Sequence, residues 1–269
     1  MLTIKNYQKA ESLEQAWKLN QQRGNRIIGG MLWMKMGKGN VQTAIDLSGL
    51  GLDGIEETQE EFRIGAMVCL RQLEVHPGLL KYTCGAVRES LRHIVGVQFR
   101  NLATVGGSIF GRFGFSDVLT MFLAMDSYVE LCQGGVIPLA EFAKGGYDRD
   151  VLVRVLVKKT PMVFHYESVR NSRTDLPVLT CCGAFLPDAL EYRFAIGARP
   201  GRAIIIEDKE HILTKDVTPE KAQAFGSSAA SWVPTGSNMR GSAQYRSHLV
   251  KVLTERTILH LQEGQMGEG

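Results

Sequence analysis

The sequence has few cysteines, and they follow no disulfide or metal-binding pattern. Their number, five, is odd, and no two form a C-x-x-C pair. This argues against a disulfide framework, a zinc site and an iron–sulfur cluster held by this chain. Reduced, mostly buried thiols are expected instead, and with them a cytoplasmic location.

Long hydrophobic runs are also absent. No apolar run approaches ~18 residues, so the sequence predicts no transmembrane helix and no membrane partner. The first residues, MLTIKNYQKAESLEQAW, lack a long apolar stretch and predict no signal peptide. Hydrophobic residues make up 44% and charged residues 22% of the chain, which is typical of a globular protein. At 269 residues, two or three lobes are expected rather than one core.

Charge of one sign does not dominate. The chain has 31 basic and 28 acidic residues, interspersed, for a formal net charge of +3. Nucleic-acid binders gather Lys and Arg on one face, so no nucleic-acid partner is expected.

Side chains in catalytic or metal-binding arrangements are lacking too. No two of the six histidines lie four residues apart, and structural or surface roles are predicted for them rather than metal ligation. No nucleophile–base pair and no paired carboxylates stand out, so no catalytic residue and no metal ligand is predicted. Such a chain suits a protein whose chemistry belongs to a cofactor.

What the sequence does contain is hydrophobic periodicity of both kinds, which predicts an α+β protein. A strand is expected at 3–6, followed by a helix that carries Leu13, Ala16 and Leu19. Further strands are predicted at 27–28, 41–48, 62–66, 128–132, 151–157, 164–169, 177–186, 191–198 and 203–207. Further helices are predicted at 77–96, from the Ser116-Asp117 cap onward, at 218–230 and at 242–262.

One glycine pattern is expected to carry no function. GLGLDG matches G-x-G-x-x-G at Gly49, Gly51 and Gly54. A dinucleotide site would require a helix to start there, but IEETQEEFRIGAM lacks helical spacing. The match is interpreted as a coincidence in a loop.

Two other glycine-rich stretches suggest a ligand. Gly29-Gly30 and Gly106-Gly107 are each expected to follow a short apolar strand. Successive glycines can expose backbone N–H groups as a nest for a diphosphate. They can equally form a tight hairpin or a β-bulge, and either pair alone favours that simpler interpretation.

A resemblance to a known family bears on this choice. RNLATVGGSIFGRFGFSDVLTMFLAMD resembles the second flavin loop in the FAD-binding subunits of molybdenum hydroxylases, the family of xanthine dehydrogenase and aerobic CO dehydrogenase. RIIGGMLW resembles the first loop, and IDLSGL and FRIGAMV resemble the segment between the two. NMRGSAQYRSHLVKVL resembles the C-terminal D-x-R-G-S-A-x-Y-R signature. The similarity spans nearly the whole chain.

The resemblance implies a fold. It is an α+β architecture with a two-lobed FAD-binding domain of the vanillyl-alcohol oxidase and CO dehydrogenase flavoprotein type. A C-terminal α+β domain with an antiparallel sheet and helices follows. The expected boundaries are 1–55 and 56–160 for the two FAD-binding subdomains and 161–269 for the C-terminal domain.

The resemblance also implies a site for FAD. Backbone would hold the diphosphate, Gly111 and Ser116 would lie beside it, and Asp117 would accept hydrogen bonds from ribityl hydroxyls. The backbone positions are Ile28, Gly29, Gly30, Met31, Leu32, Thr104, Gly106, Gly107 and Ser108.

Three residues depart from the family pattern. Met31 stands where a threonine is usual, and Ser108 replaces a frequent asparagine. Glu167 stands where many relatives have a lysine close to the flavin. A glutamate there would disfavour negative charge on the reduced flavin, so an altered reactivity is expected. Met31 and Glu167 together leave open whether the flavin is retained.

By resemblance, the chain is an electron-transfer subunit of a complex. It would pass electrons from an iron–sulfur subunit through FAD to an acceptor such as NAD, while a molybdopterin-containing subunit oxidises the substrate. Two alternatives stay open: a stand-alone flavin oxidoreductase, and a flavin-free scaffold with the same fold.

Two further groups of residues are expected to be structural. Arg240, Tyr245 and Arg246 belong to the C-terminal signature, and packing or partner contact is predicted for them rather than catalysis. Cys181 and Cys182 are neighbours in a strand and should face opposite sides, so a reactive dithiol is not expected.

Overall fold

The computed structural model describes residues 1–214 and 217–266, and the chain forms two compact units. Each unit combines segments that are distant in the sequence, and each is described by itself. Unit 1 comprises Met1–Leu73, Gly96–Gly111 and Ser127–Lys158; unit 2 comprises Glu74–Val95, Arg112–Asp126 and the described residues from Lys159 on. The subdomain boundaries at 55 and 160 stay a prediction.

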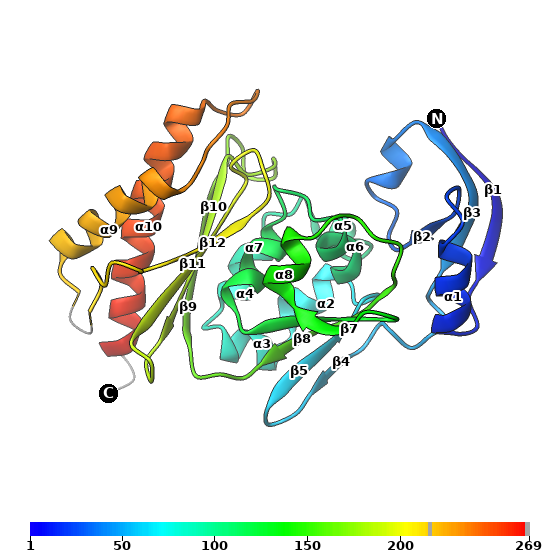
Figure 1. Ribbon diagram of the computed structural model, residues 1–269, viewed down its shortest axis with the longest axis horizontal. Coiled ribbons are helices and arrows are strands. Elements are labelled where there is room, and N and C mark those ends of the chain that lie inside the picture. Colours follow the sequence, from blue (N-terminus) through cyan, green and yellow to red (C-terminus); the bar gives the residue numbers. More distant parts are fainter. Residues whose placement is uncertain (215–216, 267–269) are drawn as a thin grey trace. The chain divides into compact units, whose positions relative to one another are not determined.

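Unit 1 contains a small parallel sheet with the strand order β1-β3-β2. Helix α1 follows β1, and the Ser12 side chain starts it by accepting a hydrogen bond from the Gln15 N–H at 3.1 Å. Ala16 of this helix is fully buried in a cluster with Ile45 and Val151. The elements are β1 (Leu2–Lys9), α1 (Leu13–Asn20), β2 (Arg26–Ile28), the 3₁₀ turn η1 (Met34–Met36) and β3 (Gly39–Asp46) (Figure 1).

Unit 1 also contains a five-stranded antiparallel sheet with the order β4-β5-β8-β6-β7. The apolar run that predicted a strand at 151–157 forms its central strand, and Val153, Val155 and Val157 are buried. The strands are β4 (Ile55–Glu57), β5 (Glu61–Gly65), β6 (Ser127–Leu131), β7 (Gly135–Pro138) and β8 (Leu152–Lys158). The nearby helices are α2 (Leu70–Val75), α5 (Val97–Arg100), α6 (Val105–Phe110) and α8 (Leu139–Lys144).

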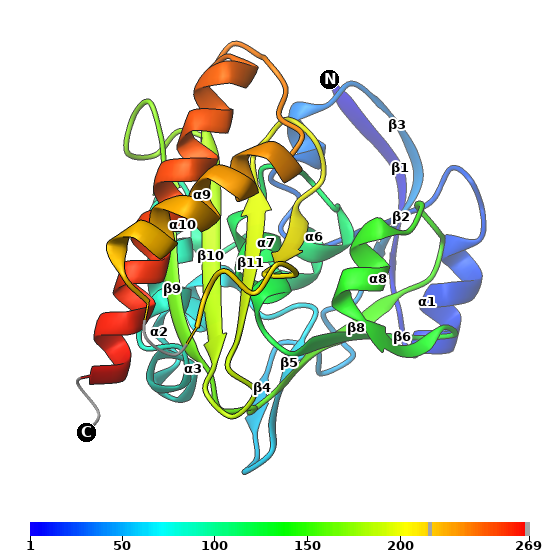
Figure 2. The same cartoon turned by 60° about the vertical axis from the view of Figure 1, so that its left-hand side comes forward.

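Unit 2 is an antiparallel sheet with helices on both faces. Its order is β12-β11-β10-β9, with α9 and α10 on one face and α4 and α7 on the other (Figure 2). The strands are β9 (Val163–Val169), β10 (Leu179–Leu186), β11 (Glu191–Gly197) and β12 (Ile204–Glu207). The helices are α3 (Pro77–Tyr82), α4 (Ala86–Leu91), α7 (Asp117–Ala124), α9 (Pro219–Trp232) and α10 (Ala243–Met266).

The two adjacent cysteines of β10 show this layering. Cys181 Sγ lies 3.6 Å from Thr257 Oγ1 of α10, whereas Cys182 Sγ lies 3.5 Å from Met121 Sδ of α7. Both are fully buried. The prediction that they face opposite sides of the strand is confirmed, and they cannot form a pair.

Three expectations about local structure are settled by the fold. The single helix predicted at 77–96 is wrong, because Cys84 and Gly85 adopt positive φ angles of 49° and 81° and separate α3 from α4. Gly106 and Gly107 lie inside α6 rather than after a strand. The GLGLDG loop leads into β4 and not into a helix, so its interpretation as a coincidence is supported.

Among the described residues, no helix combines the length and the hydrophobicity that crossing a membrane would require.

Candidate functional site

The two glycine stretches of unit 1 pack directly on each other. A Cβ at Gly30 would overlap the carbonyl oxygen of Leu102, and one at Gly29 would lie 2.6 Å from Thr104 Oγ1. Gly30 is therefore required by close contact with backbone, and Gly29 by close contact with the Thr104 side chain. Their packing fixes the segment after β2 against the segment that leads into α6.

Hydrogen bonds hold the second stretch in place. Thr104 Oγ1 accepts from the Gly107 N–H at 3.2 Å, and the Gly106 N–H donates to the Ala66 carbonyl at 2.8 Å. A Cβ at Gly106 would lie 2.7 Å from that carbonyl oxygen, so this glycine too is explained by packing. The Val105 N–H donates to the carbonyl of Val68 at 2.9 Å.

Gly107 is different from the other three glycines. It is exposed, and a Cβ there would meet only Thr104 Oγ1, at 3.1 Å. Contacts within the protein therefore account less fully for a glycine at this position than at the other three. A ligand that approaches the backbone closely would account for it.

The first stretch exposes backbone donors. Among the described residues, the N–H groups of Gly30, Met31 and Leu32 donate to no protein acceptor. Met31 adopts a left-handed φ of 58°, a conformation that occurs in backbone nests for anions. Such an arrangement suits an anion. Ile28, at the end of β2, leads into it.

The remaining residues of the predicted unit 1 site have protein partners. Ser108 Oγ donates to the Thr104 carbonyl at 3.0 Å, one turn earlier in α6. Gly111 ends that helix, and its carbonyl accepts a hydrogen bond from the Tyr147 hydroxyl at 2.6 Å. All ten predicted residues from Ile28 to Gly111 thus lie in the two segments that the glycine contacts bring together.

Ser116 and Asp117 belong to unit 2. Ser116 Oγ accepts from the Leu119 N–H at 3.1 Å and starts α7, as predicted. Asp117 Oδ1 accepts hydrogen bonds from the Tyr166 hydroxyl and from Arg170 Nη2, each at 2.5 Å. The carboxylate predicted to meet ribityl hydroxyls is therefore already fixed by two protein donors.

Burial dominates the electrostatics around Asp117. It raises the pKa of the Asp117 carboxyl above the ordinary aspartate range, although the guanidinium of Arg170 opposes the shift. Burial, together with the neighbouring Asp117, also raises the pKa of Tyr166 well above its ordinary value. Tyr166 thus remains a neutral donor to the carboxyl group.

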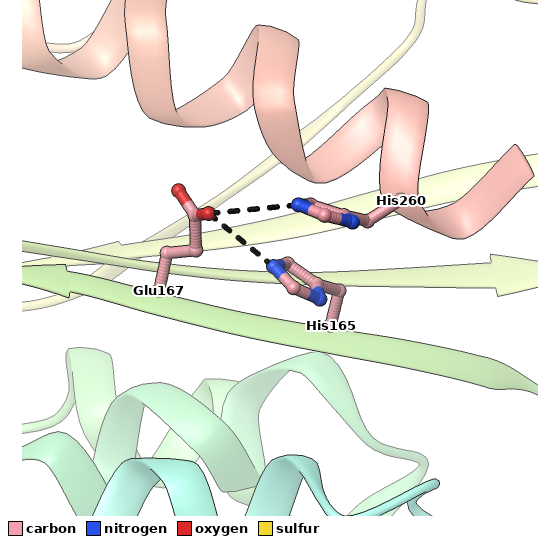
Figure 3. Close-up of side chains that lie close together, drawn as sticks. All are labelled: His165, Glu167 and His260. Atoms are coloured by element: carbon pink, nitrogen blue, oxygen red, sulfur yellow. Dashed lines mark ion pairs between the residues drawn. The ribbon is translucent and has the colours of Figure 1, made fainter. Parts of the chain in front are cut away.

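Glu167 does not share a face with Asp117. Tyr166 and Glu167 are neighbours in β9, so their side chains point to opposite faces of the sheet. Tyr166 reaches Asp117, whereas Glu167 lies toward α10 (Figure 3). The effect of Glu167 on a nearby flavin stays a prediction.

The C-terminal signature has a structural role in unit 2. Arg246 is fully buried, and its guanidinium donates to the carbonyls of Val178 at 2.9 Å and Gly236 at 2.7 Å. It also donates to the Gly241 carbonyl and to Asn238 Oδ1. Arg246 thus takes part in packing, one of the two roles predicted for it.

Several participants could not be identified from the sequence. The nearest atoms to a Cβ at Gly30 and at Gly106 are the carbonyl oxygens of Leu102 and Ala66, and the identity of a side chain does not reveal such a backbone contact. Arg170 lies 53 positions after Asp117, and no local pattern links the two. Pairing of this kind depends on the tertiary structure alone.

Comparison with known proteins agrees with this geometry. Residues 2–159 match the family described as "FAD binding domain in molybdopterin dehydrogenase". The chain belongs to this family. Residues 164–261 match the CO dehydrogenase flavoprotein C-terminal domain. The predicted resemblance and the predicted two-part α+β fold are both confirmed.

Named relatives are similar over nearly their whole length. The medium subunit of nicotine 6-hydroxylase from Paenarthrobacter nicotinovorans is 26% identical, over 94% of this chain and 95% of the relative. The glyceraldehyde dehydrogenase medium chain of Sulfolobus acidocaldarius is 24% identical, over 94% and 96%. The structure of carbon monoxide dehydrogenase from Hydrogenophaga pseudoflava matches with a TM-score of 0.85 at 21% identity, over 95% and 96% of the two chains. The chain is thus an FAD-binding oxidoreductase subunit of the molybdenum hydroxylase family.

Proposed function

We propose that this chain is the electron-transfer subunit of a molybdenum hydroxylase-type complex, with iron–sulfur and molybdopterin-containing subunits as its partners. FAD, when bound, can take up electrons singly and release them as a pair to an acceptor such as NAD. The name "medium" in the curated relatives supports a role within a larger assembly. No residue of this chain is assigned a catalytic role.

The proposal rests mainly on the backbone N–H groups of residues 30–32. Three consecutive N–H groups without a protein acceptor suit a diphosphate, because a nest of backbone donors stabilises concentrated negative charge. Gly107 is exposed and is less constrained by packing than the other three glycines, so it provides a second place for close approach. The residues of unit 1 therefore fit FAD.

Within this proposal, the residues have distinct tasks. The backbone of Ile28–Leu32 and of Thr104–Ser108 would hold the diphosphate, and Gly111 would border it. Packing of Gly30 on Leu102 keeps the two segments in register before any ligand arrives. Contact of Ser116 and Asp117 with the cofactor stays a prediction, since both belong to unit 2.

The test is a titration of the purified chain with FAD, followed by flavin absorption and fluorescence. Gly107→Val should weaken binding at least about tenfold, because the new side chain on this exposed position would occupy space that the ligand approaches. Gly54→Val is the matched control, since a Cβ there meets nothing within 4 Å. Asp117→Ala tests the predicted ribityl contact. A wild-type chain that binds no FAD at saturating concentration would refute the proposal and favour the flavin-free scaffold.

Partners and acceptor need a separate experiment. Affinity purification from the native host should recover two further chains, one with iron–sulfur centres and one with molybdopterin. Reduction of NAD by the purified complex, and not by the isolated chain, is the expected result. Steady turnover by the isolated chain would instead support a stand-alone flavin oxidoreductase. The five free thiols favour a cytoplasmic location for the assembly.

A further inference from the structure

Three potential metal ligands converge between β9 and α10 of unit 2. His165 and Glu167 are two positions apart in β9 and share one face, and His260 reaches them from α10 (Figure 3). Glu167 Oε1 lies 3.5 Å from His165 Nε2 and 4.0 Å from His260 Nε2. All three ligand atoms lie within 4.8 Å of one another.

Two atoms of this cluster lack hydrogen bonds. His165 Nε2 and Glu167 Oε2 are buried and have no hydrogen-bond partner among the described residues. Unpartnered polar atoms are rare inside proteins and commonly mark a functional or ion-binding position. Of these two, His165 Nε2 faces Glu167 Oε1, whereas Glu167 Oε2 is the carboxylate oxygen that points away from the imidazoles (Figure 3).

A fourth residue orients the third ligand. Glu263 lies one turn after His260, and its Oε2 is 3.4 Å from His260 Nδ1. A carboxylate beside one imidazole nitrogen holds the proton there and leaves the other nitrogen as a donor of its lone pair. In His260 that other nitrogen is Nε2, the atom that faces Glu167.

We infer that His165, Glu167 and His260 form a binding site for a divalent transition metal, with Zn²⁺ the best match. Two imidazoles and one carboxylate are a familiar zinc ligand set that leaves a fourth position for water. Imidazole also favours zinc over Mg²⁺ and Ca²⁺, which prefer all-oxygen sites. The ion would link β9 to α10 on the face of the sheet opposite Asp117.

Only modest rearrangement is needed. Zinc–ligand bonds of about 2.0–2.1 Å place tetrahedral ligand atoms about 3.3 Å apart. Glu167 Oε1 is 3.5 Å from His165 Nε2 and 4.0 Å from His260 Nε2, so His260 must move closer when the ion binds. The rings of His165 and His260 are stacked, with centroids 4.3 Å apart and an interplanar angle of 21°. Binding must turn the half-exposed His260 ring so that its lone pair points at the ion.

The decisive experiment is calorimetric titration of the purified full-length chain with Zn²⁺, after removal of any histidine tag. One saturable site per chain is expected. His165→Ala and His260→Ala should each weaken binding at least tenfold, and Glu263→Ala should weaken it about ten- to hundredfold. His248→Ala, which removes an exposed histidine from the same helix, is the control and should bind as the wild type does.

Anomalous diffraction at the zinc edge then locates the ion. A peak among His165, Glu167 and His260 supports the site. The inference is overturned by an absence of saturable binding to the wild type, by full-strength binding to a His165→Ala/His260→Ala double variant, or by a peak elsewhere. Circular dichroism of each variant separates loss of ligands from loss of fold. FAD binding is measured in parallel and should not change.

Discussion

Arg170 donates a hydrogen bond to the carboxylate of Asp117, and each side chain is only 5% exposed. Arg170 directly follows the last residue of β9, and Asp117 lies in the first turn of α7. Because both charges are buried, each depends on the other for compensation. The pair therefore fixes the start of α7 against the sheet of unit 2.

Removal of Arg170 should be costly. Arg170→Ala leaves the carboxyl group buried without its cation, and a loss of about 3–5 kcal/mol in the free energy of unfolding is expected. Urea denaturation measures this loss. Arg240→Ala is the comparison: its pair with Asp175 is more exposed, at 24% and 31%, and should contribute about 0–1 kcal/mol. Equal losses in both variants would contradict the assigned role.

The same variant should show a defined pH dependence. Burial already raises the pKa of Asp117, and loss of Arg170 raises it further. In the variant, native Asp117 then keeps its proton at pH values at which the unfolded state has released it. The stability of the native state therefore falls as the pH rises from the pKa of the unfolded aspartate toward the raised pKa of native Asp117. The destabilisation relative to wild type should therefore be smaller near pH 5 than near pH 8. A pH-independent difference would show that Asp117 stays charged in the variant.

Gly30→Ala should damage the fold of unit 1 before any cofactor is considered. The new Cβ overlaps the Leu102 carbonyl, and a backbone shift of this kind costs about 1–3 kcal/mol. Gly54→Ala should change stability by no more than about 0.5 kcal/mol. Thermal unfolding of the FAD-free chains makes the comparison. Equal midpoints for both variants would mean that the two glycine stretches do not depend on this contact.

Arg246→Lys should be nearly as harmful as Arg246→Ala. The guanidinium serves the carbonyls of Val178, Gly236 and Gly241 at once, and a single ammonium group cannot reach all three. We expect a loss of about 3 kcal/mol or more from acceptors left unsatisfied. Chemical denaturation gives the value. A fully stable Lys variant would show that charge alone suffices at this position.

Thiol labelling should separate the cysteines by burial. Cys84 is exposed and should react first with iodoacetamide in the native protein. Burial raises the pKa of Cys181 to about 12 and that of Cys182 well above its ordinary value, so neither forms a thiolate near neutral pH. Peptide mass spectrometry should find both unmodified until the protein unfolds. Early labelling of either would contradict the buried arrangement of β10.

Much of the fold could be predicted because most elements carry a local signal. The Val-rich run of β8 and the Ser116 cap of α7 are examples that the structure reproduces. The break between α3 and α4 could not be predicted in this way. The apolar spacing continues across Cys84 and Gly85, and only their positive φ angles interrupt the helix.

Prediction of the candidate site from the sequence was limited for a different reason. The glycine stretches were recognisable from their residues, but the reason for each individual glycine was not. A Cβ at Gly30 or Gly106 would clash with the carbonyl oxygen of Leu102 or Ala66, whereas a Cβ at Gly107 would meet only the Thr104 hydroxyl, at 3.1 Å. The histidines posed the same difficulty, because His165 and His260 lie far apart along the chain and meet only through the packing of β9 on α10.

The layering of unit 2 has a consequence for recombination between relatives. The helices that cover one face of its sheet, α4 and α7, precede the strands β9–β12 and are separated from them by strands of unit 1. A chimera joined after Lys158 would thus set one parent's Met121 against the other parent's Cys182. The contact between the two parental parts of such a hybrid lies in a hydrophobic core and not along a linker. Side chains on both sides of that contact must therefore be chosen together.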